Sequence, residues 1–481
     1  MAIKLYNFLT RKKQIFRPLK KGKAGLYTCG PTVYNYAHIG NLRTYIFEDV
    51  LKRSFEYSGF KVRHVMNITD VEDKIIKNAQ EAGKSIFEFT KPYEAVFYND
   101  LKKLNIAPAW IYPKATDHIK EMIGIIKSLI KNKLAYRFDG SVYFDVSKFK
   151  KYGRLSRLRK SDLAKGGSDF HRVDADEYEK NSAEDFVLWK AKKEGEPSWP
   201  SPWGEGRPGW HIECSAMSMK YLGESFDIHA GGIDLLFPHH ENEIAQSEGA
   251  TKKRFVKYFI EGEHLLVDGK KMSKSLGNVF TLRDLENKNF NPLAFRYLVL
   301  GAHYRTQLNF TWESLKSAQN SLGRLKDFVL NLKKINESKA QVLQDLAQRD
   351  GASRAISQQR DMRVLAKFAT EAKKAFFDDL DTPKALAQIW GLVNEFNKNS
   401  SKYDTGEVLA LLLELDRVLG LGFADVSEPE RPNDEVSHLL KERETARKSR
   451  DFTAADLLRQ KIYDLGWEIQ DNPDGPRLKK I

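Results

Sequence analysis

The spacing of apolar and polar positions near the amino terminus predicts a strand, a helix and a second strand. Residues 25–28 form a short apolar run that ends at Cys29 and is typical of a buried strand. After His38, apolar residues recur at helical spacing on one face until Gly59, which indicates the end of a helix. Residues 61–67 follow as a second strand. A strand–helix–strand unit implies a parallel sheet with a ligand site at the carboxyl ends of its strands.

The pattern changes several times along the rest of the chain. It mixes a helix (119–134), a strand (141–146) and a turn-rich stretch before strand and helix patterns resume at Trp210. From Pro292 it is helical to about Leu421, and a proline-containing linker then leads to two helices (436–448 and 454–465) and a strand near 467–469. We therefore expect an α/β protein: a Rossmann-like parallel-sheet catalytic domain in two halves (1–111 and 209–290), a connective insertion (112–208), a helical domain (291–424), and a linker with a small C-terminal unit (425–481).

Composition and charge narrow the class of protein. The chain has 481 residues, of which 41% are apolar and 30% charged, as in an ordinary globular protein. It lacks an apolar run long enough for a membrane span or a signal peptide, and its two cysteines indicate a reducing, cytoplasmic setting. The net charge is +14, with a basic cluster between Lys148 and Lys165. A polyanionic partner such as RNA or plain solubility explains that excess equally well.

Two stretches carry candidate phosphate chemistry. Lys271-Met272-Ser273-Lys274-Ser275-Leu276-Gly277-Asn278 is a cationic loop suited to neutralising a polyphosphate, and it follows a predicted β-hairpin of residues 258–260 and 265–267 closed by Asp268-Gly269. Residues 31–41 place His38 at the start of the first helix, where free N–H groups favour phosphate. Together the two stretches resemble the KMSKS and HIGH motifs of class I aminoacyl-tRNA synthetases. The fourth HIGH position is Asn41, whose amide can donate a hydrogen bond but carries no charge.

The two cysteines, Cys29 and Cys214, are candidate metal ligands. If Pro238 begins a helix, His239 and Glu243 stand at i and i+4 and share one face. Two thiolates, an imidazole and a carboxylate form a plausible zinc set.

Neighbouring histidines offer alternatives to that set. In the same predicted helix His240 pairs with Ile244, which directs it to a different, partly apolar side. A competing zinc set uses His211, three residues before Cys214, in place of His239. The spacing leaves both sets open.

Four longer stretches resemble cysteinyl-tRNA synthetases, and the resemblance runs over essentially the whole chain. These stretches are residues 27–33, 67–70, 209–217 and 237–243. The resemblance implies that the residues matching the family's metal ligands hold one zinc ion, to which the substrate thiolate adds a further ligand. These residues are Cys29, Cys214, His239 and Glu243.

The resemblance also implies a two-step reaction in which cysteine attacks the ATP α-phosphate and then passes from the adenylate to the terminal ribose of tRNA. It assigns phosphate contacts and catalysis to His38, Asn41, Lys271 and Lys274, and Mg²⁺ is expected with ATP. Residues 231–234 resemble the family's nucleotide and amino-acid contact loop.

Within that loop Gly231 and Gly232 allow close backbone approach, and Asp234 either meets a ribose hydroxyl or the substrate amine or serves as a structural cap. Thr69 and Trp210 are expected to bind the amino acid.

The expected partners are tRNA(Cys), ATP and L-cysteine, without a membrane, for a chain that acts as a monomer. Zinc would separate cysteine from nearly isosteric serine by ligand softness, since shape separates such pairs weakly. Two alternatives remain: a cysteine ligase acting on an amino sugar, which the C-terminal unit argues against, and a non-catalytic tRNA-binding paralogue, which the retained lysines and ligands argue against.

Overall fold

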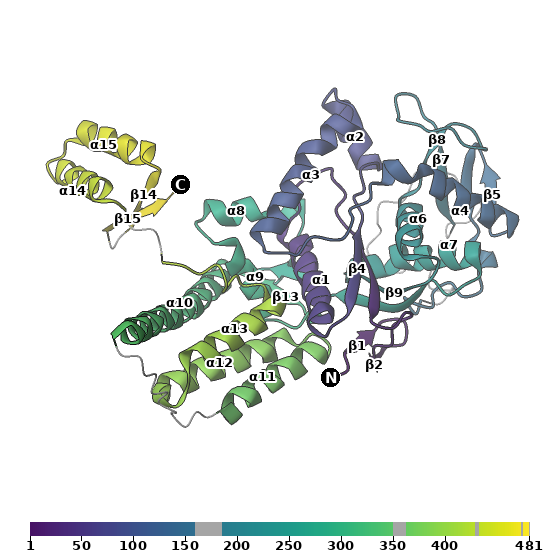
Figure 1. Ribbon diagram of the computed structural model, residues 1–481. Coiled ribbons are helices and arrows are strands. Elements are labelled where there is room, and N and C mark those ends of the chain that lie inside the picture. The colour runs from purple at the N-terminus through teal and green to yellow at the C-terminus, as the bar shows by residue number, and fades with distance from the viewer. Residues whose placement is uncertain (159–184, 350–361, 429–431, 473–474, 481) are drawn as a thin grey trace. The chain divides into compact units, whose positions relative to one another are not determined.

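The computed structural model describes residues 1–158, 185–349, 362–428, 432–472 and 475–480 (Figure 1). The chain forms two compact units, Met1–Ala424 and Asp425–Ile481, each described by itself. In the described ranges, every helix is too short or too polar to cross a membrane. The finer domain boundaries within the first unit stay a prediction.

The first unit is built on a parallel sheet in the strand order β10-β9-β3-β4 (Figure 1). The predicted strand–helix–strand unit is confirmed: β3 (Lys23–Thr28) leads into α1 (Ile39–Tyr57), and β4 (Lys61–Met66) follows. The other two strands, β9 (Phe226–Gly232) and β10 (Val256–Gly262), come from far along the chain. Because parallel strands end at one edge, the segments that follow β3 and β9 meet there.

A small sheet carries the basic loop. Asp268 and Gly269 have φ angles of 50° and 73°, so they turn β11 (Leu265–Val267) back onto β12 (Lys270–Lys271). The other edge of β11 pairs with β13 (Leu308–Phe310). The predicted hairpin between residues 258–260 and 265–267 is therefore wrong, because β10 belongs to the large sheet.

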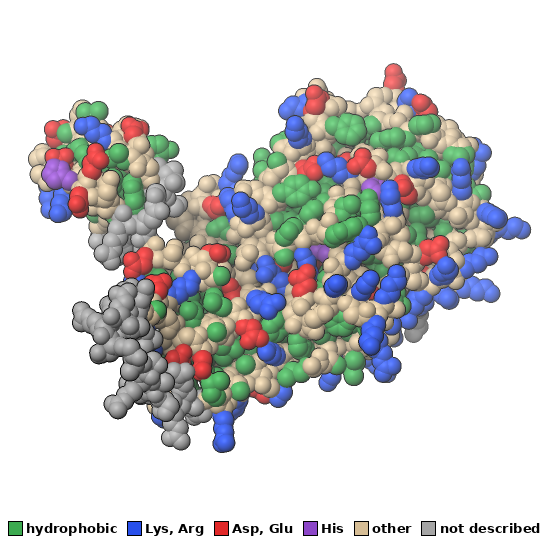
Figure 2. Space-filling model, in the orientation of Figure 1, with side chains coloured by type: hydrophobic (Ala, Val, Ile, Leu, Met, Phe, Trp, Pro, Cys, Tyr) green, Lys and Arg blue, Asp and Glu red, His purple; other side chains and the backbone are tan. Residues whose placement is uncertain are grey.

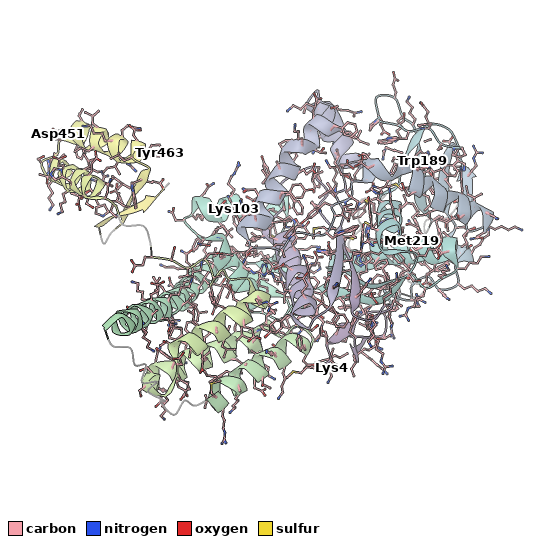
Figure 3. The ribbon with its side chains drawn as sticks, in the orientation of Figure 1. Lys4, Lys103, Trp189, Met219, Asp451 and Tyr463 are labelled. Atoms are coloured by element: carbon pink, nitrogen blue, oxygen red, sulfur yellow. The ribbon has the colours of Figure 1, made fainter. Side chains whose placement is uncertain are left out.

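Helices and a second sheet lie between β4 and β10. The sheet is antiparallel, in the order β5-β6-β7-β8, and Trp189 of β7 lies in its buried core (Figure 3). The Asp73 carboxylate accepts hydrogen bonds from Lys190 and Arg207 and so ties this sheet to α2. The bounds are α2 (Asp73–Glu81), α3 (Ile86–Lys103), α4 (Ile119–Lys131), β5 (Ala135–Phe138), β6 (Ser141–Phe144), β7 (Phe186–Ala191), β8 (Gly206–Pro208), α6 (Trp210–Leu222) and α7 (Glu241–Thr251).

The surface of the first unit carries much of the basic excess. Figure 2 shows many Lys and Arg side chains on the face that it views. In the predicted basic cluster, Lys148 pairs with Asp145 at 2.9 Å and Arg154 with Glu248 at 2.9 Å. The part of that cluster from residue 159 onward lies outside the described residues.

Helices complete the first unit, as the pattern after Pro292 predicts, although β13 interrupts them. Two short strands at the amino terminus, absent from the sequence prediction, pair antiparallel with each other. The bounds are β1 (Lys4–Asn7), β2 (Lys12–Ile15), α8 (Leu282–Asn287), α9 (Pro292–Leu300), α10 (Trp312–Arg349), α11 (Met362–Phe377), α12 (Thr382–Lys398) and α13 (Thr405–Leu419).

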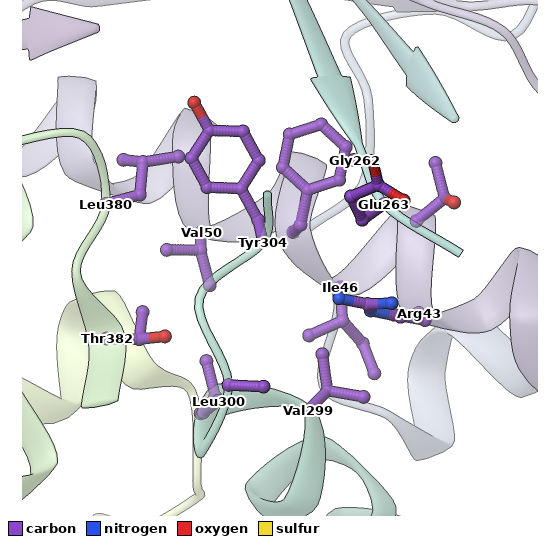
Figure 4. A pocket seen from close by; sticks show the side chains of 13 residues that line it. Arg43, Ile46, Val50, Gly262, Glu263, Val299, Leu300, Tyr304, Leu380 and Thr382 are labelled. Carbon is purple, nitrogen blue, oxygen red and sulfur yellow. The ribbon is translucent and has the colours of Figure 1, made fainter. Parts of the chain in front are cut away.

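Asp379, between α11 and α12, ties these helices to β1 and to the segment after α9. Its buried carboxylate accepts the backbone N–H of Tyr6 and the hydroxyl of Tyr304, both at 2.7 Å, and pairs with Arg305 at 2.5 Å. A small cavity lies beside Tyr304, lined also by Arg43 of α1 (Figure 4). The Arg43 guanidinium donates to the backbone oxygens of His264 and Thr306. This junction therefore connects α1, the small sheet and the helices.

The second unit has its own core. It contains α14 (Asp434–Lys448), α15 (Phe452–Asp464) and a hairpin of β14 (Trp467–Asn472) with β15 (Gly475–Lys480). Trp467 is 7% exposed and packs in that core, so it is a structural residue.

Candidate active site

Four predicted ligands meet at the carboxyl edge of the large sheet. Cys29 follows β3, Cys214 lies in α6, and His239 and Glu243 come from the turn before α7 and from its first residues. One ligand atom from each lies within 4.8 Å of every other, and all four side chains are buried. The fold thus brings together two cysteines that lie 185 positions apart in the sequence.

The distances fit tetrahedral zinc. The two sulfurs are 3.9 Å apart, and the His239 Nε2 and Glu243 Oε1 atoms are 3.2 Å apart. With Zn–S of about 2.3 Å and Zn–N or Zn–O of about 2.0 Å, a tetrahedron places ligand atoms about 3.8 Å and about 3.3 Å apart, respectively. The residues present therefore match this metal in both ligand type and spacing.

The protonation states of the four ligands favour the binding of a metal cation. Burial raises the pKa of Cys214, but the Cys29 hydrogen bond and the His239 charge outweigh it and bring that pKa to about 6. Burial opposes protonation of His239, yet the Cys214 thiolate raises its pKa to about 10. Against burial, His229 and His239 hold the pKa of Glu243 well below its usual range. Two anionic ligands are thus available near neutral pH, and a bound metal would release the His239 proton.

Two further histidines reach this cluster, and the sequence analysis did not find their contacts. His229 of β9 donates from Nε2 to Glu243 at 3.0 Å, which orients that carboxylate. The chain bends at Phe237 and is helical from Pro238 into α7, as the sequence predicts, but the His240 ring nevertheless reaches the cluster. The His240 Nε2 atom lies 3.7 Å from Cys29 Sγ, and Cys29, His229, His240 and Glu243 form a second, overlapping set of possible ligands.

His211, the sequence-based competitor, contacts the site through another residue. Its Nδ1 atom is 2.9 Å from the Nδ1 atom of His239, whose Nε2 faces Glu243. A histidine in the middle of a largely apolar strand, as His229 is in β9, was the one signal that could have been noticed in the sequence.

A glycine sets the position of Cys29. A Cβ atom on Gly30 would stand 1.8 Å from the backbone oxygen of Asn67, so only glycine fits between the ends of β3 and β4. The Asn67 side chain accepts the Gly30 N–H at 3.1 Å. This close approach fixes the chain directly after the first sulfur ligand.

His38 caps α1 together with Asn41. The His38 Nδ1 accepts the Asn41 backbone N–H, and the Asn41 Oδ1 accepts the His38 backbone N–H, both at 3.2 Å. Burial lowers the pKa of His38, although the Asp234 charge opposes it, so the ring is neutral near pH 7. Because Nδ1 accepts, the proton of the neutral ring is on Nε2.

The basic loop lies against the start of α1. The backbone N–H of Ile39 donates to the oxygen of Phe280 at 2.8 Å, and a Cβ on Gly40 would stand 2.4 Å from the Met272 methyl carbon. The Asn278 amide shapes the loop, accepting from Ser273 N–H at 2.8 Å and donating to the Lys271 oxygen at 3.2 Å. The two predicted motifs are therefore neighbours in space.

The two loop lysines differ in what the structure describes. Lys271 ends β12 and is exposed. Lys274 begins a short 3-10 turn, Lys274–Leu276, and its side chain lies outside the described residues.

The remaining predicted residues surround the cluster or the start of α1. Asp234 is exposed just past β9, and a Cβ on Gly232 would stand 2.5 Å from its carboxylate. Gly231 is equally restricted, since a Cβ there would stand 3.0 Å from the His240 ring. Trp210 begins α6, and its ring centroid is 4.5 Å from that of His239.

Thr69 contacts Glu213, the residue before Cys214. Its buried hydroxyl donates to Glu213 at 3.2 Å and accepts from the Asn67 side chain at 3.2 Å.

Comparison with known proteins agrees with this geometry. Residues 15–320 match the family model of the class I (C) tRNA synthetase catalytic domain, and residues 373–424 match the DALR domain. Methionyl-tRNA synthetase of Mycobacterium tuberculosis, solved with methionyl-adenylate, shares the fold with a TM-score of 0.60 at 15% identity, covering 85% of this chain and 94% of that one. The fold is thus that of a class I aminoacyl-tRNA synthetase.

Full-length relatives give the family. A cysteine–tRNA ligase of Protochlamydia amoebophila is 47% identical over 489 residues, covering 100% of this chain and 98% of the relative. One of Brachyspira hyodysenteriae is 45% identical over 486 residues, covering 99% of each chain. The chain belongs to the cysteine–tRNA ligase family.

Proposed function

We propose that this protein joins L-cysteine to tRNA(Cys) through a cysteinyl-adenylate formed from ATP, with zinc held by Cys29, Cys214, His239 and Glu243. The observation that carries the proposal is the buried cluster of these four side chains at the ends of the strands. Helix α1, which follows β3 of the same sheet, begins at the phosphate motif. Its two sulfurs favour zinc over a harder cation. The overlapping set with His229 and His240 contains one sulfur and is less suited to zinc.

When bound, zinc would supply a soft Lewis acid that takes a thiolate in preference to a serine hydroxyl. The Trp210 ring, packed on His239, is proposed to limit the space beside the ligands. Thr69 is proposed to bind the amino acid, and Asp234 is proposed to hold its amino group or a ribose hydroxyl. The pocket therefore selects a small amino acid by its sulfur.

The phosphates are proposed to lie over the start of α1. The neutral His38 ring donates a hydrogen bond from its Nε2–H to the phosphates, because its Nδ1 atom already accepts the Asn41 N–H in the helix cap. Asn41 helps by fixing that ring. Lys271 and Lys274, with Mg²⁺ brought by ATP, neutralise the charge that builds on the departing pyrophosphate. Gly231 and Gly232 let the nucleotide approach the backbone.

The helices after Pro292 and the terminal unit are proposed to contact the tRNA, and the chain is proposed to act as a cytoplasmic monomer. In the terminal unit Arg447 pairs with Asp471 at 2.9 Å, so its charge is partly neutralised before RNA arrives. Size-exclusion chromatography with light scattering checks the monomer.

Two assays test the function. Exchange of labelled pyrophosphate into ATP should depend on cysteine and not on serine, and purified tRNA(Cys) should become charged. Exchange without charging, together with transfer to glucosamine, would favour the amino-sugar ligase. Binding of tRNA without cysteine-dependent exchange would identify a non-catalytic paralogue. Metal analysis of the purified protein should find one zinc per chain.

A further inference from the structure

An exposed tyrosine stands where the two phosphate motifs meet. Tyr36 is two residues before His38, is 38% exposed, and its backbone N–H donates to the Asn35 side chain at 2.8 Å. His38 itself pairs with Thr281, just beyond the basic loop. The Tyr36 ring therefore lies at the rim of the proposed adenylate site and is not required for the metal cluster or the α1 cap.

Two aromatic rings of α3 support Tyr36. The ring centroid of Tyr93 is 5.1 Å from that of Tyr36, with the rings edge to face, and Phe89 stands 5.3 Å from Tyr93. Both supporting rings are half-buried. The support limits the motion of the Tyr36 ring, which lowers the entropy lost when a ligand stacks on it.

A cation completes the arrangement. The guanidinium carbon of Arg283, an exposed residue of α8, lies 5.7 Å from the Tyr36 ring centroid. Helix α8 is held to α3 by an ion pair of 2.7 Å between Glu286 and Lys103, the latter seen in Figure 3. Aromatic and cationic groups therefore come from one rigid support made of two helices and the loop before α1.

We propose that Tyr36, Phe89, Tyr93 and Arg283, the Tyr36 platform, bind the single-stranded 3′ end of the tRNA, with a base stacked on Tyr36 and a phosphate near Arg283. This inference rests on the proposed function, whose second step needs the terminal ribose beside the adenylate. Exposed aromatic rings with a neighbouring Arg are what unpaired nucleotides use for binding, whereas paired RNA offers no base face. The platform would guide the end of the RNA past His38.

The test combines Tyr36 variants with two RNAs. Charging of tRNA(Cys) and pyrophosphate exchange are measured for Tyr36→Ala and Tyr36→Phe. Phe87→Ala is the control, since Phe87 is an exposed ring (61%) of α3, the helix whose other rings support Tyr36. For each variant, the kcat/KM of charging with respect to tRNA is divided by the rate of pyrophosphate exchange. This ratio should fall about tenfold in Tyr36→Ala and stay unchanged in Tyr36→Phe and Phe87→Ala. Dividing by the exchange rate removes any loss caused by misfolding.

Binding gives a second readout. Intact tRNA(Cys) and the same tRNA without its unpaired 3′ nucleotides are titrated against each protein at fixed salt. Tyr36→Ala should weaken binding of the intact RNA about tenfold and leave that of the shortened RNA unchanged.

Three results would overturn the platform: equal weakening for both RNAs, an equal loss in exchange and charging, or a Phe variant as poor as the Ala variant. The second would place Tyr36 in the adenylate site instead. Failure of the proposed function is separate, because the unaltered protein would then charge no tRNA at all.

Discussion

His38 and Asn41 each accept the other's backbone N–H at 3.2 Å, so the two residues cap α1 reciprocally. Asn41, which departs from the HIGH pattern, thus has a structural task that needs no charge. The cap also fixes which ring nitrogen of His38 faces outward.

Two substitutions of Asn41 should separate its role in the helix cap from the effect of a charge at this position. Asn41→Ala removes the acceptor and should lower the free energy of unfolding by about 1 kcal/mol. Asn41→Asp keeps an acceptor oxygen and should retain stability, but its charge should raise the KM for ATP about fivefold, a penalty of about 1 kcal/mol. Urea unfolding and pyrophosphate exchange measure the two effects. An Ala variant as stable as the unaltered protein would contradict the cap.

Gly40 should matter for the basic loop rather than for folding. A Cβ there would stand 2.4 Å from the flexible end of Met272, which can move at little cost to stability. Gly40→Ala should therefore melt near the normal temperature but reduce the exchange rate ten- to hundredfold, because the loop is displaced from α1. Adding Met272→Ala removes the contact and should restore most of the rate. No recovery in the double variant would argue against this contact.

The two overlapping ligand sets predict different zinc losses. His239→Asn and Cys214→Ser should each leave the protein with well under one zinc per chain and abolish cysteine-dependent exchange. His240→Asn should keep the metal, because this histidine belongs to the set with one sulfur. Chelation should inactivate the unaltered protein reversibly, with zinc restoring activity. Zinc loss in His240→Asn with retention in His239→Asn would reverse the assignment.

The carboxylate of Asp379 should contribute far more to the free energy of unfolding than that of its neighbour Asp378. Asp379→Asn keeps a residue that tolerates the left-handed φ of 67° but leaves Arg305 without its charge partner, so unfolding should become easier by about 3 kcal/mol. Asp378 pairs with Lys13 at the surface, 54% exposed, and Asp378→Asn should cost at most about 1 kcal/mol. Urea unfolding of both variants checks the difference, and similar costs would refute it.

His64 should make the first unit sensitive to mild acid. Burial lowers its pKa to about 3, from a usual value of about 6.5. The unfolded chain therefore takes up a proton below pH 6.5 that the folded chain refuses, and stability falls as pH falls from 6.5 towards 3. Between pH 7 and 5 this should cost about 2 kcal/mol.

The comparison variant for this prediction is His64→Gln, which does not titrate. It should lose about 2 kcal/mol less than the unaltered protein over the same pH interval in urea unfolding. An equal pH dependence of the two proteins would contradict a neutral, buried imidazole.

The sequence predicted the elements whose periodicity is long and unbroken. The unit of β3, α1 and β4 follows from it, because one face of α1 is apolar over five turns and Gly59, with φ of 94°, ends the connection. Short strands were not predicted because they carry too little periodicity. β13 has three residues, and it pairs with β11 across 43 positions of sequence.

The site was predictable where chemistry alone selects residues. Cys29 and Cys214 were the only sulfur ligands of their type, so their pairing needed no geometry. His229 and His240 were missed because their contacts join β9, the segment after β3 and the start of α7, which are far apart in the sequence. Local spacing cannot reveal such contacts.

The close approach of Cys29 and Cys214 also has a consequence for biosynthesis. One thiol leaves the ribosome early, while its three companions follow only after the β5–β8 sheet has been made. Until residue 214 has emerged, the nascent chain carries a single sulfhydryl, and the proposed ligand set is complete only once residue 243 has followed. If zinc selects cysteine as proposed, that capacity is acquired at one late moment of synthesis, and fragments that end before residue 243 should lack it.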